Sequence, residues 1–168
     1  MLYLIANGAS PTTAAQVVVT TGTSIKTLLQ IKPGATTVLK IVEWGISFDG
    51  SAAATPIKVE LLQTDVAATV TAHVAAGIVK LDGGALMAGD PSTDHFEVGT
   101  AATGYTGSAE GSITASRMFD VQLIAPTNQY VKQFPLGREP IIEAAKFARI
   151  RVTAGAAVNA YAYMIIEV

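Results

Sequence analysis

The sequence predicts an all-β protein, an antiparallel β-sandwich or jelly roll with one long irregular loop. In Ile57–Leu61, apolar residues alternate with charged ones, and this period of two is typical of a strand with one buried face. Other short runs are rich in β-branched and aromatic residues, as strands are. Turn dipeptides such as Asp49-Gly50 separate these runs. Many short strands divided by turns indicate a sandwich or jelly roll.

The first thirteen residues are expected to form an arm outside the domain. Met1–Thr13 is apolar only as far as Ile5, and its remainder is too polar for a core. We therefore predict an extended segment that adds against a partner, with Leu2, Tyr3 and Leu4 as contact residues. Residues 14–168 then form a single domain, because a chain of 168 residues is one domain's worth.

Nine runs carry the strand pattern. In chain order they are Gln16–Thr20, Ile25–Ile31, Thr36–Asp49, Ile57–Leu61, Thr69–Val74, Phe119–Leu123, Gln129–Phe134, Ala148–Val152 and Val158–Val168. Gly45 inside the third run predicts a bulge or bend. Trp44 beside it is expected in the core.

The later runs allow predictions about which side chains face inward. Alternation in Phe119–Leu123 predicts that its apolar residues are buried, and the same pattern places Arg149 and Arg151 on an outer face. Both faces of Val158–Val168 are largely apolar, which predicts a central strand covered on both sides. Ile141–Phe147 fits either a helical turn or a strand followed by a turn.

The stretch from Gly83 to Ser112 lacks this regularity. It consists mainly of small and polar residues with little periodicity. Irregular loops longer than about 12–15 residues are uncommon in compact domains. A functional loop and an excursion without a role both fit this stretch.

Composition excludes several classes of function. Only 14% of the residues are charged, against about 25% in average domains. The net charge is −2 and no Lys/Arg run occurs, so a nucleic-acid partner is not expected. No apolar stretch reaches the roughly 18 residues of a membrane span, and the N-terminus lacks a signal-peptide pattern. Without cysteine there are no disulfides or thiolate metal sites.

No catalytic constellation stands out. His73 and His95 are far apart, whereas a cupin-type metal site needs clustered histidines. His95 and Glu97 are conceivable as two metal ligands, but a solvated loop histidine is the favoured interpretation. Glu43, Asp49 and Glu60 are interpreted as outward-facing, solubilising carboxylates. We therefore expect neither an enzyme nor a cofactor.

The most unusual segment is Gln129–Pro140, which clusters two aromatics, two prolines and three charges. Aromatic residues and arginine are enriched at interface hot spots. An ordinary connection between strands is the alternative. The residues predicted to contact a partner here are Tyr130, Lys132, Phe134, Arg138 and Glu139.

Three segments, Lys40–Gly50, Gln129–Pro140 and Phe147–Ala156, resemble the head decoration, or cement, proteins of tailed bacteriophages. The similarity spans most of the chain and is weakest in the loop at 83–112. It implies a sandwich or jelly roll that trimerises and clamps neighbouring major capsid subunits on the outside of the phage head. The protein would then be assembled in the host cytoplasm and reside on the virion.

A trimeric receptor- or carbohydrate-binding module of a phage tail tip is the alternative function. Such modules usually display aromatic platforms on loops, and the long loop offers only Phe96 and Tyr105. A jelly-roll enzyme is disfavoured by the two separated histidines.

Overall fold

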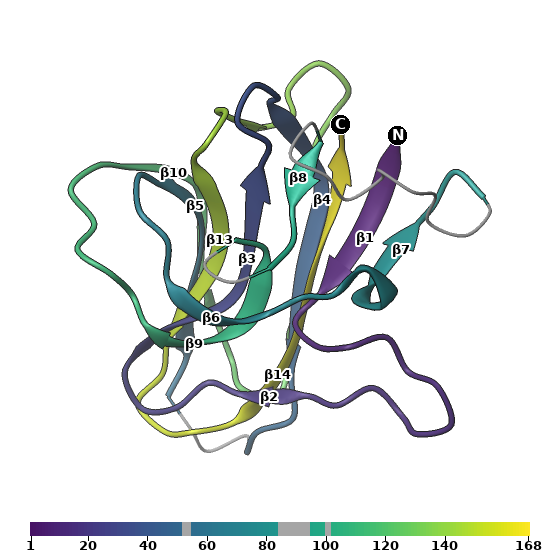
Figure 1. Cartoon of the computed structure of the whole chain (residues 1–168). Helices are drawn as coiled ribbons and strands as arrows, with labels where there is room; N and C mark the ends of the chain where they lie inside the picture. The colour runs from purple at the N-terminus through teal and green to yellow at the C-terminus, as the bar shows by residue number, and fades with distance from the viewer. Residues whose placement is uncertain (52–54, 84–94, 100–101) are drawn as a thin grey trace.

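The computed structural model describes residues 1–51, 55–83, 95–99 and 102–168. In these residues the chain is all-β, with two antiparallel sheets packed as a sandwich (Figure 1), which confirms the predicted fold class. Sheet A has the strand order β11-β4-β14-β1-β7, with β12 paired to β4 and β2 to β14. Sheet B has the order β10-β5-β13-β3-β9-β6, with β8 paired to β3.

The strands of sheet A are β1 (Leu2–Ala6), β2 (Val19–Thr20), β4 (Leu39–Phe48), β7 (Ile78–Lys80), β11 (Gln129–Gln133), β12 (Ile141–Ile142) and β14 (Asn159–Glu167). Those of sheet B are β3 (Ile25–Pro33), β5 (Ile57–Thr64), β6 (Thr69–Ala72), β8 (Phe96–Glu97), β9 (Gly104–Ala109), β10 (Ser116–Ile124) and β13 (Phe147–Thr153). One 3₁₀ turn, η1 (Ala75–Gly77), precedes β7.

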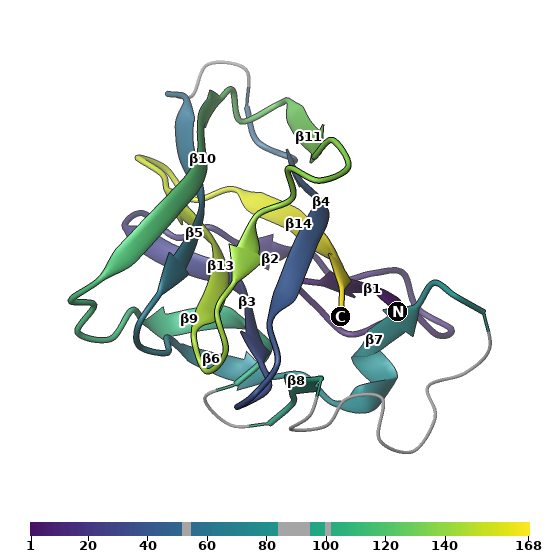
Figure 2. The ribbon, with the colours of Figure 1, turned by 90° about the horizontal axis from the view of Figure 1, so that it is seen from above.

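The core lies between the two sheets, which Figure 2 shows from above. Alternate residues of β14 from Ala160 to Ile166 point into it, as do Leu61 of β5 and Ile150 of β13, which are paired neighbours. Trp44 is fully buried, as predicted. Burial of this apolar face is the main stabilising contribution to the fold.

The expected N-terminal arm does not exist as such, because β1 is an inner strand of sheet A. It pairs with β14 on one side and with β7 on the other, and Tyr3 and Ile5 are fully buried. Five apolar residues suffice for a strand here because strands on both sides supply hydrogen bonds. Only the segment after it, residues 9–18, is mostly exposed and projects from the body (Figure 1). Deleting Met1–Thr13 would therefore remove part of the core.

The stretch predicted to be one irregular loop contains strands. Phe96–Glu97 forms β8 and Gly104–Ala109 forms β9, which pairs with both β3 and β6. Strand β9 was not predicted because it consists mainly of small residues, and Gly and Ala have a low propensity for strands. Residues 84–94 and 100–101 of the predicted loop lie outside the described residues.

The strand bounds and the pairing of β4 with β14 decide two further predictions, for Ile141–Phe147 and for Gly45. Ile141–Phe147 forms the short strand β12 and a turn before β13, so the strand alternative is confirmed. Gly45 does not lie at a bulge, because it pairs directly with Tyr163. The register shift between β4 and β14 lies further along, between Ile165 and Ile166. Gly45 instead leaves room for the Tyr163 ring, whose Cε1 would lie 2.6 Å from an added Cβ.

Candidate functional site

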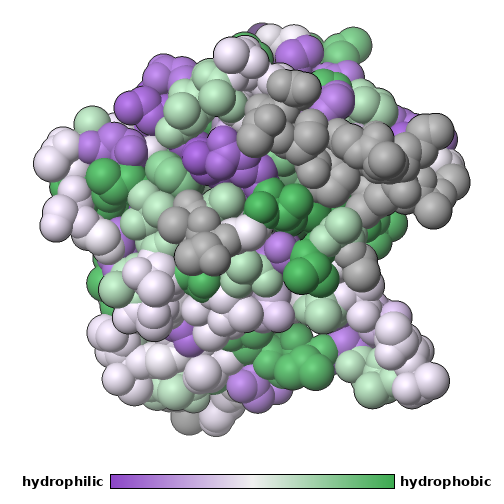
Figure 3. Space-filling view, in the orientation of Figure 1, coloured by the Kyte–Doolittle hydropathy of each residue, from purple (hydrophilic) through white to green (hydrophobic). Residues whose placement is uncertain are grey.

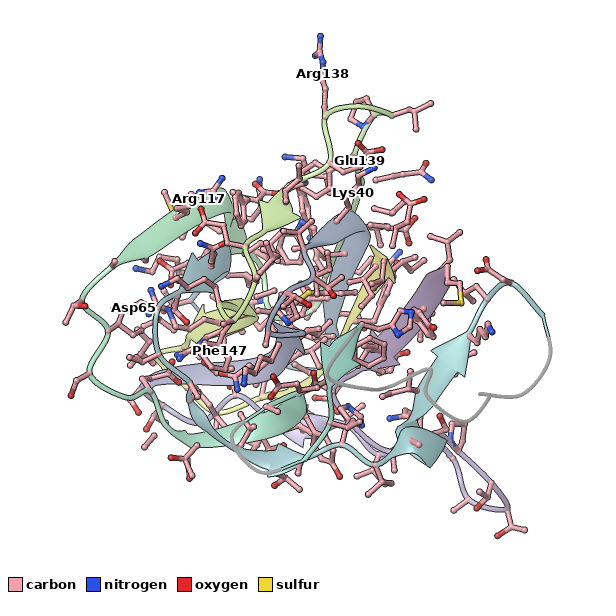
Figure 4. All side chains as sticks on the ribbon, turned by 45° about the horizontal axis from the view of Figure 1, so that its top comes forward. Lys40, Asp65, Arg117, Arg138, Glu139 and Phe147 are labelled. Carbon is pink, nitrogen blue, oxygen red and sulfur yellow. The ribbon has the colours of Figure 1, made fainter. Side chains whose placement is uncertain are left out.

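The connection between β11 and β12 is a projecting turn, here named the 134–140 loop. The backbone N–H of Arg138 donates to the carbonyl of Pro135 (2.9 Å), and Gly137 takes the positive φ that such a turn requires. The side chain of Leu136 is 97% exposed. Arg138 extends away from the body at the tip, whereas Glu139 lies back towards Lys40 and the sandwich (Figure 4).

The base of this loop is fixed to sheet A on both sides. The N–H of Phe134 donates to Val42 (2.9 Å), and Pro140 accepts from the N–H of Ile41 (3.0 Å). Because the backbone at the base of the loop is already fixed, little conformational entropy of the loop would be lost if Leu136 and Arg138 at its tip bound a partner. Arginine and a large apolar side chain are suited to a protein contact.

Three other residues predicted to bind a partner make contacts within the chain. Tyr130, Lys132 and Phe134 point to the inner side of β11, where Tyr130 packs against Trp44 with ring centroids 5.3 Å apart. The Nζ of Lys132 lies 5.1 Å from the centre of the Phe134 ring. They close the open edge of the sandwich between β10 and β11, and their role at an interface stays a prediction.

Asp120 of β10 is the centre of this edge cluster. It accepts hydrogen bonds from Gln122 Nε2 (2.8 Å) and the Tyr130 hydroxyl (3.0 Å), and Lys132 Nζ lies 3.2 Å away. Burial alone would raise the pKa of Asp120, but these donors and the lysine charge lower it overall. Burial and the Asp120 carboxylate raise the pKa of Tyr130 to about 12. The cluster joins the two sheets as a satisfied polar network.

From Asp120 onwards the side chains of β10 face the opposite way to the prediction, whereas Phe119 packs against the core as predicted. Asp120 is 9% exposed, while Val121 and Leu123 are 42% and 75% exposed. A bulge between Met118 and Asp120 resets the alternation, and the edge cluster then draws the polar side chains inward. We name the exposed residues Met118, Val121 and Leu123 the β10 strip.

Sheet A has an outer face of which only Leu4 was predicted from the sequence as a contact residue. Residues directly opposite on neighbouring strands share a face, so Val131, Tyr163, Ile165 and Leu4 lie on the same side of the sheet. We name this surface the sheet A face, with Leu4, Val79, Val131, Tyr161, Tyr163 and Ile165. Its β14 residues are half-buried, although this strand was expected to be covered on both sides.

The predicted N-terminal contact residues divide between the two sides of β1. Leu2 and Leu4 are half-buried on the outer side, so the structure brings them together with Ile165 and Glu167 of β14. Tyr3 is fully buried and packs edge-on against Phe96, with ring centroids 5.1 Å apart, which removes it from the predicted interface. The apolar residues at the outer positions of β14, Tyr161, Tyr163 and Ile165, are the feature of the sequence from which the rest of this face could have been predicted.

Tyr163 lies flat in the middle of the sheet A face. Its ring covers Gly45, and its hydroxyl donates to Glu43 Oε1 at 2.6 Å. Burial and the Glu43 carboxylate raise the pKa of Tyr163. The ring of Tyr161 lies beside it, with centroids 6.1 Å apart. The two rings make the centre of the face flat and aromatic.

The histidines and carboxylates do not assemble a metal site in the described part of the chain. Within those residues no group of three or more His, Asp and Glu side chains is placed to hold an ion. His73 is buried and bonds the carbonyl of Ala6 (2.7 Å). Glu97 pairs with Lys32 Nζ at 2.5 Å. Glu60, expected to face solvent, is 8% exposed and pairs with Arg151 (2.9 Å).

The fold is a β-sandwich whose surface carries several exposed large apolar side chains, among them Leu136, Leu123 and Met118. Figure 3 shows one side as mostly pale, weakly polar residues with separate apolar groups. Among the described residues, none belongs to a helix with the length and apolar character needed to cross a bilayer. Neither a protein-family model, nor a curated protein, nor a solved structure matches the chain.

Proposed function

We propose that this chain is a bacteriophage head decoration protein that binds the outer surface of the capsid and stabilises it. The proposal comes from the resemblance of three segments to such proteins. The structural observation that supports it best is the 134–140 loop, which lies within one of those segments and presents Leu136 and Arg138 on a fixed base.

The partners in this proposal are the major capsid protein and further copies of the chain, as a trimer. A decoration protein binds only the assembled shell, so each bound copy stabilises the shell by mass action. Several loops held by one oligomer raise the apparent affinity further, because the second and third contacts become intramolecular. Contacts that are weak individually are then sufficient for stable binding to the shell.

Co-sedimentation with undecorated heads tests the proposal. We expect the wild-type protein to sediment with heads, and the double variant Leu136→Ala/Arg138→Ala to lose most of this binding. Val17→Ala is the matched control, since Val17 is also an exposed apolar residue on a projecting segment. Circular dichroism should show the same β-fold for all three proteins.

Two results would contradict the proposal in different ways. If the wild-type protein leaves heads in the supernatant, or binds host cells instead, the decoration function is wrong. If the double variant binds heads as well as the wild type does, the function stands and the 134–140 loop is not the contact.

A further inference from the structure

We propose that Asn7-Gly8, at the end of β1, is a modification site. Its asparagine deamidates when the end of β1 opens from β14, and the product no longer fits its place in the sheet. The pair is the one asparagine-glycine dipeptide in the sequence. Such pairs are especially prone to this reaction, because glycine has no side chain to shield its backbone nitrogen. The inference is independent of the proposed function.

The side chain of Asn7 continues the hydrogen bonding of β1 with β14. Its Nδ2 donates to the carbonyl of Ala160 (3.0 Å), and its Oδ1 accepts from the N–H of Ala162 (3.0 Å). The pairing of β1 ends at Ala6, and β2 takes up the same edge of β14 at Ala160, since β4 occupies the other edge. The Asn7 amide therefore fills the gap between β1 and β2 along this edge.

In the folded chain the Asn7 side chain is enclosed and held. Asn7 is 0% exposed, and its backbone N–H donates to the carbonyl of Ala162 (2.8 Å). The preceding carbonyl, that of Ala6, is bonded to Nε2 of the buried His73 (2.7 Å). Reaction at Asn7 therefore requires this end of β1 to open.

Packing explains why the labile pair includes a glycine. After Gly8 the chain projects as the segment 9–18 and then returns to form β2 (Figure 1). A Cβ on Gly8 would lie 2.6 Å from Gln16 Nε2 and 3.1 Å from the carbonyl oxygen of Val17. The returning chain thus leaves little room for a side chain that would shield the Gly8 nitrogen.

The reaction joins the backbone nitrogen of Gly8 to Cγ of Asn7. This nitrogen loses its proton to the solvent and bonds to Cγ, and the Cγ–Nδ2 bond breaks as Nδ2 leaves as ammonia. Water then opens the resulting succinimide ring at either carbonyl, which gives an aspartate or an isoaspartate. In the fold the amide must first release both hydrogen bonds to β14, so the rate should follow the population of open copies.

The product cannot restore the contacts of the amide. A carboxylate only accepts hydrogen bonds, so it would present an oxygen to the carbonyl of Ala160, where Nδ2 of Asn7 donated. Of the two β14 partners of the side chain it keeps the N–H of Ala162, and its charge would be buried. Isoaspartate also lengthens the backbone by a methylene group. Opening of β1, otherwise reversible, is then made permanent.

Peptide mapping by mass spectrometry after incubation at mildly alkaline pH tests the first part. In urea, Asn7 should deamidate faster than Asn128, which precedes glutamine and is exposed in the fold. Folding should slow the reaction at Asn7 at least about a hundredfold. Ile5→Val, a small loss of buried volume in β1, should raise the rate in the folded protein about two- to tenfold and leave the rate in urea unchanged. Leu123→Ala, at an exposed site on β10, should alter neither rate.

The variant Asn7→Asp tests the second part. At neutral pH its urea midpoint should lie below that of the wild type. Burial disfavours the charged carboxylate, so the difference should narrow as the pH is lowered towards about 4, where a protonated carboxyl can again donate to Ala160. Asn128→Asp, at an exposed position, should keep the wild-type midpoint.

Three results would overturn the proposal. Equal rates at Asn7 in the folded and the urea-unfolded protein would show that the contacts with β14 do not control the reaction. An Asn7 that remains intact in urea would show that the pair is not a modification site. An Asn7→Asp variant as stable as the wild type at neutral pH would show that the product fits the sheet. None of these results bears on binding to phage heads, which is measured separately.

Discussion

At the scale of single residues, the side chain of Arg149 illustrates how an outward-facing position becomes interior. The strand pattern places it on the outer side of β13, as predicted, yet it is fully buried. The segments that follow β5 and β9 fold over this side of sheet B. Arg149 bonds the carbonyls of Val66 and Glu110 and the Glu110 carboxylate (3.1 Å), which fastens both segments.

We expect Arg149→Ala to lower the free energy of unfolding by about 3–5 kcal/mol. The substitution leaves the carbonyls of Val66 and Glu110 without this donor, and it leaves the Glu110 carboxylate without its cation, although Thr27 still donates to that carboxylate. Urea denaturation at a fixed protein concentration measures this loss. Arg117→Ala is the matched control, since its pair with Glu143 is about half exposed on both sides and is worth less than about 1 kcal/mol. Equal losses in the two variants would show that Arg149 does not fasten the segments.

The buried His73 side chain makes stability depend on pH. Burial lowers its pKa, and the hydrogen bond to Ala6 only partly offsets this. The unfolded state therefore takes up the proton first as the pH falls below about 6.5, and stability decreases from there down to the lowered pKa of the folded state. The loss has a slope of up to about 1.4 kcal/mol per pH unit.

Melting temperatures between about pH 7.5 and pH 5.5 test this expectation. The wild type should lose stability across this range, and His73→Gln should show a flatter profile, since its amide can still donate to Ala6. Val17→Ala removes no titratable group and should keep the wild-type slope. A slope unchanged in His73→Gln would assign the pH dependence to other groups.

At the scale of elements, β9 depends on a close approach between backbones. A Cβ on Gly104 would meet the carbonyl oxygen of Thr71 in β6, as well as Val70 Cγ2 at 2.6 Å. The paired strands cannot separate without losing the hydrogen bonds that hold β6 to sheet B. This glycine is therefore required by packing, with no need for a positive φ.

We expect Gly104→Ala to destabilise the protein by about 1–3 kcal/mol, the usual cost of overpacking. Amide exchange should accelerate first in β6 and β9. Gly155→Ala, where an added Cβ has nothing within 4 Å, should change stability by less than about 0.5 kcal/mol. Retained protection of β6 in Gly104→Ala would mean that the strands adjust around the methyl group.

At the scale of the whole molecule, the proposed trimer would link stability to protein concentration. An oligomer that forms only from folded subunits stabilises them by mass action. The melting temperature of the wild type should therefore rise as the protein concentration is raised. For a trimer, a hundred-fold dilution lowers the free energy of unfolding by about 1.8 kcal/mol per chain, and differential scanning calorimetry over this range measures the change. A wild-type melting temperature independent of concentration would contradict the proposed trimer.

Sequence by itself determined the fold class and the main strands. Alternation in Ile57–Leu61 and Ala148–Val152 is a local property, because a strand has a period of two wherever it lies. Tertiary structure alone decided which face is covered. The bulge in β10 reversed Val121 and Leu123, neighbouring strands drew Leu2–Ala6 into the sheet, and folded segments buried Arg149. Burial of a strand face depends on residues that are distant in sequence, and a single bulge inverts every side chain beyond it. Local periodicity therefore does not determine which face is buried.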